Sequence, residues 1–343
     1  MRSRLNVRAI AALATATTFA PIASAAYYAI DMMPASVFSN IFLYGSSASH
    51  QVGYLEKGPG IYRAVVFNGS PVGMQLHIPV GFSSASMHGT NGTYHVGNGD
   101  HASGYIHALR WTASGGASID LTPVGMSSSS ASDISATNLI GGWAATPSGP
   151  MQAHLWSGTT PHNVHPAGTE MSVVNSVHLN NAAGYVRIAG NYRAIRWIGT
   201  TGTNVMLHPT SGYAQTMAQG ISSTDQVGWG LPPGAPTSYR ALRWTGTATS
   251  CTSLHPAAYF SSAAVDTNGS RQVGHAQTGA TVHAVYWNGT ASSMVNLSSL
   301  LPALGPGYGN AYATTINAAG DIAGHAYNSI TGRWHPILWK QDK

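Results

Sequence analysis

Two short stretches in the middle of the chain decide its fold: Asp225-Gln226-Val227-Gly228-Trp229 and Arg240-Ala241-Leu242-Arg243-Trp244. Their glycine and final tryptophan each belong to a series that recurs about every 45 residues. The glycine series, in which a small or β-branched apolar residue precedes each member, comprises Gly53, Gly97, Gly141, Gly184, Gly228, Gly274 and Gly324. The aromatic series comprises Phe67, Trp111, Trp156, Trp197, Trp244, Trp287 and Trp339. A period of roughly 40–50 residues, built from strands and turns, is typical of a radial β-repeat.

One repeat unit contains four short predicted strands. Residues 213–221 supply the first, the glycine stretch the second, the tryptophan stretch the third, and residues 253–255 the fourth, which Pro256 ends. In the next unit Asn288-Gly289 directly follows the aromatic strand, and Asn-Gly is the strongest two-residue hairpin signal. Four antiparallel strands in each unit predict one blade of a β-propeller.

The seventh unit lacks a fourth strand of its own, because the chain ends shortly after Trp339. Residues 28–34 match residues 118–123 in register, so the N-terminal segment is expected to supply the missing strand. The sequence therefore predicts an all-β, seven-bladed β-propeller of four-stranded antiparallel blades. The N-terminal strand would close the ring by joining the C-terminal blade, which leaves no open sheet edge.

The strands also resemble those of a known family. His107-Ala108-Leu109-Arg110-Trp111 and His283-Ala284-Val285-Tyr286-Trp287 are similar to the His-Ala-Phe strand of the bacterial extracellular HAF repeat, with Leu or Val in place of the Phe. Residues 317–324 are similar to its Asn-x-x-Gly-x-Val-Val-Gly strand. The resemblance covers about residues 27–340 and implies an exported repeat protein with a β-propeller-like fold. It implies no defined activity and supplies no catalytic residues.

Residues 1–25 have the features of a secretory signal peptide. Three arginines precede an apolar stretch over residues 9–22, and Ala23-Ser24-Ala25 offers small residues for cleavage. No other stretch is apolar over the roughly 20 residues that a membrane span needs. We therefore expect residues 26–343 to form a single propeller domain without a membrane span, secreted to the cell exterior or the periplasm.

Composition excludes several classes of function. Charged residues make up 7% of the chain, the net charge is +5, and no cluster of basic residues could follow a phosphate backbone, so we expect no nucleic-acid partner. Cys251 is the single cysteine, which excludes an internal disulfide. No phosphate loop, nucleophile elbow, His-Glu-x-x-His or paired-cysteine motif is present. We expect neither a metal nor a cofactor.

Three histidines, each between a fourth strand and a proline, repeat in successive units: His165, His208 and His255. One hypothesis is that they bind a metal or an anionic ligand, because neutral imidazole is a common metal ligand. The other is a repeated structural role, with each ring bonded to a neighbouring backbone carbonyl. Outer strands lie too far apart to share one metal ion, which favours the structural role.

A polar residue stands four positions before each aromatic of the series: Arg63, His107, Gln152, Arg193, Arg240, His283 and His335. Arginine and histidine exchange at this position, and both can donate a hydrogen bond. We therefore expect these side chains to donate to a backbone carbonyl of the next blade. Asp31 and Asp120 occupy equivalent places before the end of a fourth strand.

The loops between a fourth strand and the next first strand carry large apolar residues: Phe38, Phe82, Met126, Tyr213, Tyr259, Phe260 and Tyr308. One interpretation is that they line a channel mouth and bind a sugar or a peptide. The other is that they fill the centre of the ring as core.

Carboxylates are scarce, and those near the hairpins, such as Asp133 and Asp266, are expected to accept backbone N–H groups in turns. Asp100 and Glu170 lie outside the repeat pattern and are the candidates for a glycosidase pair. The sequence favours a non-enzymatic binding or interaction scaffold for an extracellular glycan or protein. The alternatives are a secreted enzyme that acts on a polysaccharide or another substrate at the channel mouth, and a structural coat or matrix protein.

Overall fold

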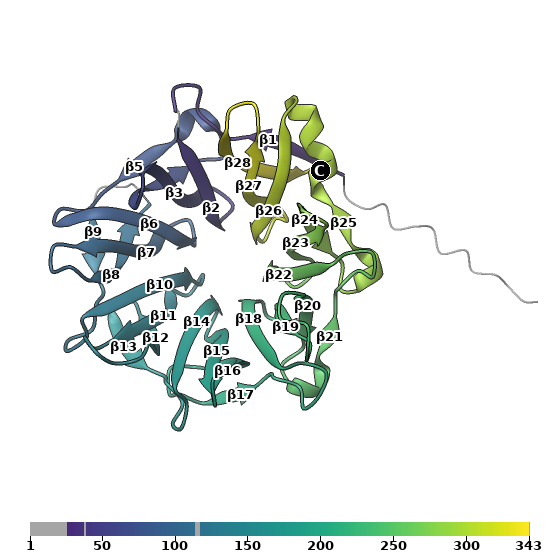
Figure 1. Cartoon of the computed structure of the whole chain (residues 1–343). Helices are drawn as coiled ribbons and strands as arrows, with labels where there is room; N and C mark the ends of the chain where they lie inside the picture. The colour runs from purple at the N-terminus through teal and green to yellow at the C-terminus, as the bar shows by residue number, and fades with distance from the viewer. Residues whose placement is uncertain (1–25, 38, 114–116, 343) are drawn as a thin grey trace, which may run out of the picture.

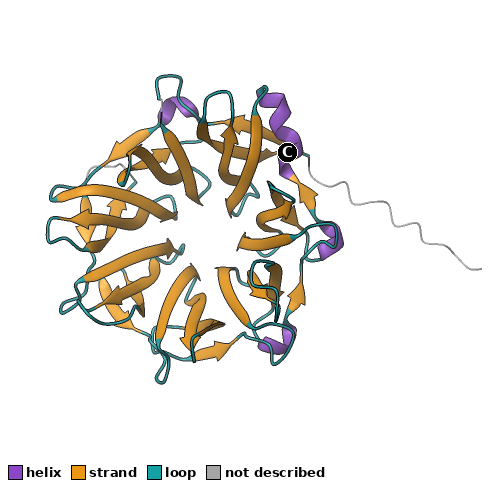
Figure 2. Ribbon diagram, viewed as in Figure 1, coloured by secondary structure: helices purple, strands orange, loops and turns teal. Residues whose placement is uncertain are grey.

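Seven four-stranded antiparallel sheets surround a central axis in the computed structural model, which describes residues 26–37, 39–113 and 117–342 (Figures 1 and 2). The seven-bladed β-propeller predicted from the sequence is confirmed. The first strand of each unit lies nearest the axis, and the later strands follow outward (Figure 1). The proposed signal peptide, residues 1–25, falls outside the described residues.

Blade 1 consists of β2 (Asn40–Ser46), β3 (Gln51–Gly58), β4 (Ile61–Phe67) and β5 (Gln75–His77). Blade 2 consists of β6 (Phe82–Thr90), β7 (Tyr94–His101), β8 (Ile106–Thr112) and β9 (Ser118–Asp120). Blade 3 consists of β10 (Ser128–Ile134), β11 (Leu139–Ala145), β12 (Gln152–Ser157) and β13 (Thr160–Asn163). Blade 4 consists of β14 (Met171–His178), β15 (Asn181–Ile188), β16 (Asn191–Ile198) and β17 (Asn204–Met206). Blade 5 consists of β18 (Gln215–Ile221), β19 (Gln226–Leu231), β20 (Arg240–Trp244) and β21 (Thr252–Ser253). Blade 6 consists of β22 (Ser261–Thr267), β23 (Gln272–Thr278), β24 (Thr281–Trp287) and β25 (Val295–Asn296). The 3₁₀ helices are η1 (Pro71–Gly73), η2 (Ala248–Ser250), η3 (Ala291–Ser293) and η4 (Leu297–Leu304). No helix in the described part of the chain is both long and apolar enough to cross a bilayer.

The two ends of the chain share blade 7. This blade contains β26 (Tyr308–Ile316), β27 (Ile322–Asn328), β28 (Arg333–Gln341) and the N-terminal strand β1 (Tyr27–Asp31) as its outermost member. Strand β1 pairs antiparallel with β28, with Ala29 opposite Trp339. The predicted closure is confirmed, and the outer edge of β28 is paired rather than exposed.

The repeated glycine allows two strands of one blade to approach closely. A Cβ atom on Gly53 would lie 1.8 Å from the carbonyl oxygen of Phe42 on the innermost strand, and the equivalent glycines of the other blades show 1.9 or 2.0 Å. Any larger residue would force these strands apart. In blade 3 the residue at this position is Gly142, which pairs with Ala131, whereas Gly141 pairs with Asp133. The sequence assignment of Gly141 was therefore wrong by one residue, because two glycines stand side by side.

The repeated aromatic residue fills the space between blades. All seven members of the series are at most 2% exposed. The indole N–H of Trp156 donates to the carbonyl of Leu121 at 2.9 Å, and that of Trp197 donates to the carbonyl of Val164 at 2.9 Å. Both acceptors follow the outermost strand of the preceding blade, so Trp156 and Trp197 pack and bond across a blade interface, whereas the indole N–H groups of the other four have no partner in the described chain.

The polar residues four positions before the aromatic divide into two groups. The arginines bond to the next blade as predicted: the Nη1 atoms of Arg63, Arg193 and Arg240 donate to the carbonyls of Ser83 (2.9 Å), Ala214 (2.5 Å) and Phe260 (2.8 Å). The prediction was wrong for the three histidines and for Gln152, whose Oε1 accepts the amide of Asn163 in its own blade. His283 lies 2.9 Å from the Thr278 hydroxyl of the same blade. His107 bonds to Asp120 at 2.6 Å and His335 to Asp31 at 2.8 Å, both on the outermost strand of the same blade. Imidazole is shorter than the arginine side chain, and each carboxylate offers it a nearer acceptor.

A β-bulge interrupts the innermost strand of every blade near its end. A bulge leaves one residue without a ladder partner and redirects its side chain. The seven bulge residues are Tyr44, His88, Ser132, Asn175, Gln219, Val265 and Thr314.

Candidate functional site

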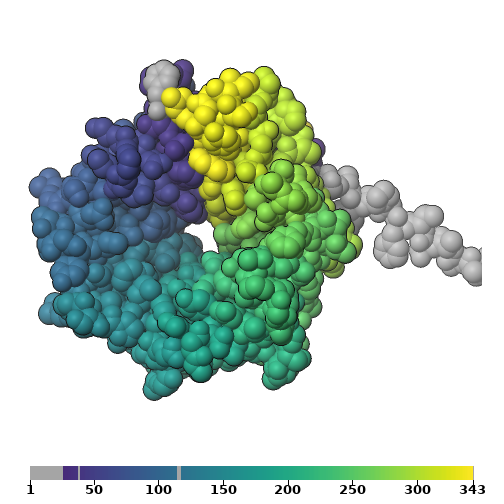
Figure 3. Space-filling model, viewed as in Figure 1, coloured from purple at the N-terminus to yellow at the C-terminus, as the bar shows by residue number. Residues whose placement is uncertain are grey.

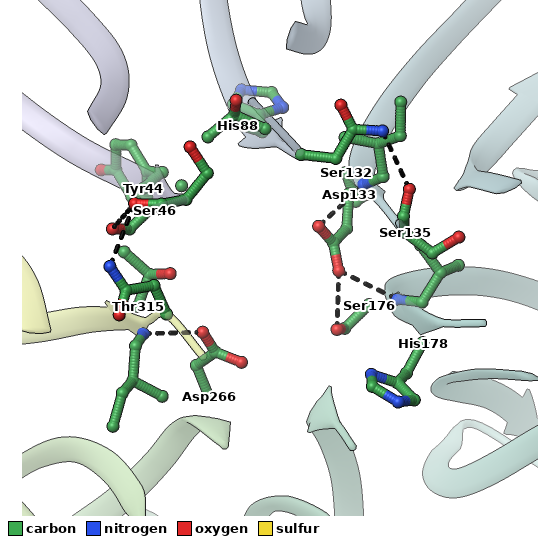
Figure 4. A pocket seen from close by; sticks show the side chains of 18 of the residues that line it. Tyr44, Ser46, His88, Ser132, Asp133, Ser135, Ser176, His178, Asp266 and Thr315 are labelled. Atoms are coloured by element: carbon green, nitrogen blue, oxygen red, sulfur yellow. Dashed lines mark hydrogen bonds between the residues drawn. The ribbon is translucent and has the colours of Figure 1, made fainter. Parts of the chain in front are cut away.

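A cavity of about 580 Å³ occupies the central channel, and all seven bulge residues line it. The remaining walls come from the ends of the innermost strands and the hairpins that follow them, including Ser46, Ser135 and His178 (Figure 4). The space-filling view shows the molecule hollowed at its centre (Figure 3). This volume lies within the roughly 300–1,000 Å³ that is usual for small-molecule sites.

The bulge position differs from the repeated glycine and aromatic positions of the blade. The glycine is present in all seven blades, and the aromatic position holds six tryptophans and one phenylalanine. At the bulge, by contrast, each blade presents a different side chain to the same cavity. Packing fixes the residue type at these two positions, whereas the bulge side chains line the cavity, where His88, Asn175 and Thr314 also bond to a backbone carbonyl of the next blade. The diversity of the bulge side chains gives the channel an asymmetric wall of hydroxyl, amide, imidazole, phenol and apolar groups.

Asp133, the residue after the bulge in blade 3, joins its blade to blade 4. Its Oδ2 accepts the Ser176 hydroxyl at 2.8 Å and the Val177 N–H at 2.9 Å, and its Oδ1 accepts the N–H of Ile134 at 2.7 Å (Figure 4). Burial raises the pKa of Asp133 to about 6, and these hydrogen bonds only partly oppose the effect. The carboxyl therefore holds an inter-blade contact at the rim of the cavity.

Asp266 occupies the same position in blade 6 and bonds to blade 7. Its Oδ2 accepts the N–H of Ile316 at 2.9 Å, and its Oδ1 accepts the N–H of Thr267 at 2.7 Å. Burial raises the pKa of Asp266 to about 7, and the negative charge of Asp133 adds to the increase. Both aspartates accept backbone N–H groups as expected, but at the bulged strand ends rather than within the hairpin turns.

The cavity has no basic charge to balance these carboxyls. Its lining, as far as the described residues show, contains no lysine or arginine. Burial lowers the pKa of both His88 and His178, so both imidazoles are neutral at pH 7. His88 is held by a 2.9 Å hydrogen bond between its Nδ1 and the carbonyl of Ala131. The channel therefore suits neutral polar or cationic groups better than anions.

The hydroxyl of Ser176 does not form part of a nucleophile and base pair. Its hydrogen-bond partner is the Asp133 carboxylate, which also accepts two backbone N–H groups. No histidine bonds to this hydroxyl in the described part of the chain. A serine nucleophile needs an adjacent base that is itself oriented by a third group, and this arrangement is not formed here.

The repeated histidines have a shared structural role. Nδ1 of His165, His208 and His255 lies 2.7–2.9 Å from a hydroxyl on the next blade, that of Ser172, Thr216 and Ser262 respectively. Each hydroxyl also accepts a backbone N–H from the third strand of the preceding blade, at 2.8–3.0 Å. The expected carbonyl partner was wrong, because the hydroxyl lies between the ring and the backbone. Burial lowers the pKa of all three, to about 4 for His208 and His255.

The loop residues proposed for ligand binding lie away from this cavity. Phe82 and Tyr308 begin β6 and β26, whereas the cavity is lined by the opposite ends of these strands. Tyr213 and Tyr259 pack against hydrophobic clusters between blades, Phe260 is 52% exposed, and Met126 is partly buried. Phe38 falls outside the described residues. Ligand binding by these loops stays a prediction.

Other candidate groups are not brought together. Asp100 lies on β7 in blade 2, while Glu170 pairs with Arg187 at 3.2 Å beside blade 4, and neither lines the cavity. Burial raises the pKa of the Cys251 thiol to about 11, which makes it unreactive at neutral pH. Over residues 26–37, 39–113 and 117–342, no three histidine, cysteine or acidic side chains are grouped to hold a metal ion.

Comparisons with known proteins show the fold. No known family pattern and no curated protein matches the sequence. Among solved structures, the β-propeller domain of the Trilobed protease from Pyrococcus furiosus is similar with a TM-score of 0.58 and 8% identity over 88% of this chain and 96% of that one. An acylaminoacyl peptidase (0.57, 9% identity, 88% and 51% covered) and a puromycin-hydrolyzing peptidase from Mycobacterium tuberculosis (0.56, 10%, 86% and 52%) are also similar. This chain spans about half the length of these two peptidases.

Sequence reasoning missed the bulge residues, although a signal for three of them exists. Tyr44, His88 and Gln219 are each followed by a glycine inside a predicted first strand. An isolated glycine within a strand is typical of a bulge or a close backbone approach.

Proposed function

We propose that this protein is an exported binding protein that takes a polar ligand, a glycan or a peptide segment, into its central channel. The observation that supports this function best is the ring of seven different bulge side chains around one cavity. In a purely structural propeller, this position would be free to repeat the same residue. Export is supported by the basic, apolar and small-residue segments at the N-terminus.

The chemistry of the lining defines the ligand. The channel offers hydroxyl, amide and carboxyl groups and one tyrosine ring, with no cationic side chain among its described residues. Hydroxyl and amine groups on a ligand would find acceptors there, whereas a phosphate or carboxylate would find no counter-charge. The ligand is therefore neutral or cationic.

Calorimetric titration of the purified protein with a panel of oligosaccharides and short neutral or basic peptides tests this proposal. The key variant is Ser132→Trp, because Ser132 faces the cavity (Figure 4) and makes no side-chain hydrogen bond in the described chain. We expect the indole to block the channel and lower affinity at least tenfold. The matched control is Ser292→Trp on the exposed helix η3, which should bind like the parent. Equal binding by both variants, or no binding of any panel member by the parent, would refute the proposal.

A second candidate function has one observation in its favour. Asp133 and Asp266 face the same cavity, and burial raises the pKa of each to about 6 and about 7, so protonated and ionised carboxyls coexist there near neutral pH. Glycosidases use two carboxyl groups in this way. Each carboxyl here already accepts at least two backbone or hydroxyl donors, which favours binding over catalysis. Release of reducing sugar from the same oligosaccharides, lost in Asp266→Asn, would favour the enzyme.

A further inference from the structure

A second cavity, of about 370 Å³, lies between blades 5 and 6 and adjoins the channel. Its lining residues are Gln219, Trp229, Tyr239, Ala263, Val265 and His275. Gln219 and Val265 also line the central channel, so the two cavities share a wall. Trp229 and Tyr239 meet edge to face, with ring centroids 4.8 Å apart. An aromatic surface is therefore present beside a polar channel.

This inter-blade cleft is open because Ala263 is small. Other blades have a larger residue, or one that forms a hydrogen bond, at the equivalent position. At the two following interfaces the equivalent second-strand residue is covered: His275 by Tyr312 and His325 by Phe42, each with ring centroids 5.0 Å apart. At the interface of blades 2 and 3, the equivalent contact is a 3.0 Å hydrogen bond from Asn98 to Ser130. At blades 5 and 6 the covering position is held by Ala263, whose methyl group leaves the cleft beside Trp229 open.

The cleft contains polar side-chain groups that have no hydrogen-bond partner, or only a weak one, within the described protein. The side chains of Trp229, Tyr239 and His275 make no hydrogen bond within the described chain, and the amide of Gln219 makes only a 3.8 Å contact with the sulfur of Met217. Burial lowers the pKa of His275 to about 4, so its ring is neutral. Tyr239 is 38% exposed and Trp229, Gln219 and His275 are partly buried, so unpaired neutral donors and acceptors surround an aromatic face that a ligand can reach.

We propose that the cleft between blades 5 and 6 is a subsite for one neutral sugar ring, stacked on Trp229 and continuing into the channel through Gln219. A sugar ring has an apolar C–H face, which fits an indole, and a rim of hydroxyl groups, which fit the amide, phenol and imidazole. None of the six lining residues is charged at neutral pH, so an anionic group finds no counter-charge here, whereas the hydroxyl groups of a neutral sugar match the uncharged donors and acceptors. This inference rests on the proposed function and specifies its ligand class.

The test uses calorimetric titration with neutral oligosaccharides selected on a glycan array. Ala263→Phe should fill the cleft with the side chain that Phe42 places at the equivalent position of blade 1, and we expect it to lower affinity more than tenfold. Val173→Phe introduces the same ring at the equivalent position of blade 4, outside both cavities, and should bind like the parent. Gln219→Ala removes a hydrogen-bonding group without adding bulk and should weaken binding about fivefold. Thermal unfolding of each variant confirms that it is folded.

The outcomes separate the two proposals. Loss of binding in Ala263→Phe and Gln219→Ala, with binding kept in Val173→Phe, would support the sugar subsite. Binding that survives both cleft variants but is lost in Ser132→Trp would overturn the subsite and leave the channel as the binding site. If no neutral oligosaccharide binds the parent, the subsite is overturned, while the peptides of the earlier panel still test the channel.

Discussion

The Oδ2 atom of Asp31 lies 2.8 Å from Nδ1 of His335, a residue 304 positions further along the chain. The same carboxylate oxygen accepts the phenol of Tyr308 at 2.5 Å. Burial raises the pKa of Asp31, but hydrogen bonds from His335, Tyr308 and the Met33 N–H outweigh it and hold this pKa below its usual value. These contacts fasten the N-terminal strand to the last blade and so close the ring.

The contribution of this closure to stability can be measured against a matched pair. Asp120 and His107 make the same contact in blade 2, at 2.6 Å, where the outer strand is already tethered by its own hairpin. We expect Asp31→Ala to lower the free energy of unfolding by about 1–3 kcal/mol. Asp120→Ala should cost less, because loss of its bond releases no chain end. Urea denaturation of both variants checks this prediction, and equal losses would contradict it.

The close approach behind the glycine repeat gives a second prediction. A Cβ on Gly228 would lie 1.9 Å from the carbonyl oxygen of Met217, whereas a Cβ on Gly309 would meet nothing within 4 Å. Gly228→Ala should therefore destabilise the protein by on the order of 3 kcal/mol, and Gly309→Ala should change stability little. Thermal or urea unfolding of the two variants measures the difference. A small loss in Gly228→Ala would mean that the two strands can separate without cost.

The fold could be predicted from the sequence because backbone geometry imposes residue types that repeat. Only glycine fits beside the innermost strand, and only a large aromatic fills the space between blades, so both leave a periodic record. The closure could be predicted because residues 28–34 have the pattern of a fourth strand. Where two glycines adjoin, at Gly141 and Gly142, the pattern alone did not fix the register.

The site was harder to predict for the same physical reason. The bulge side chains line a cavity that accepts side chains of different size and chemistry, so they follow no repeat. The cleft beside Trp229 exists because Ala263 is smaller than the residues at the equivalent position of other blades. This difference becomes visible only when neighbouring blades are compared in space. The large apolar loop residues were proposed to bind a ligand because of their size, but Tyr213 and Tyr259 pack against hydrophobic core.

The carboxyl of Asp266 should make stability fall as pH rises near neutrality. Its folded pKa of about 7 lies above the unfolded value of 3.8, so the native state binds the proton more tightly. Stability from this group is fully present below about pH 4 and is lost as pH rises through 7. Asp266→Ser, which copies Ser176 of blade 4, should show a smaller loss between pH 4.5 and 7 in urea denaturation. An unchanged slope in the variant would contradict the assignment.

His325 should act in the opposite direction and in a lower pH range. Its ring is 7% exposed among Phe42, Tyr312 and Trp334, and its buried Nδ1 has no hydrogen-bond partner in the described chain. Burial lowers its folded pKa to about 3, with the neighbouring His275 adding to the effect, whereas an unfolded histidine titrates near 6.5. Below pH 6.5 this histidine becomes protonated in the unfolded chain but stays neutral in the native protein. The free energy of unfolding therefore decreases as pH falls from about 6.5 towards 3.

The substitution His325→Phe isolates this effect, because phenylalanine keeps an aromatic ring in the cluster and cannot be protonated. At pH 7 the parent and the variant differ by packing alone. At pH 4.5 the parent alone should have lost about 2 kcal/mol through this histidine. The urea midpoint of the variant should therefore fall less between pH 7 and 4.5. If both proteins lose the same stability over this range, the imidazole of His325 is protonated in the native state and lies in a more polar environment than its neighbours indicate.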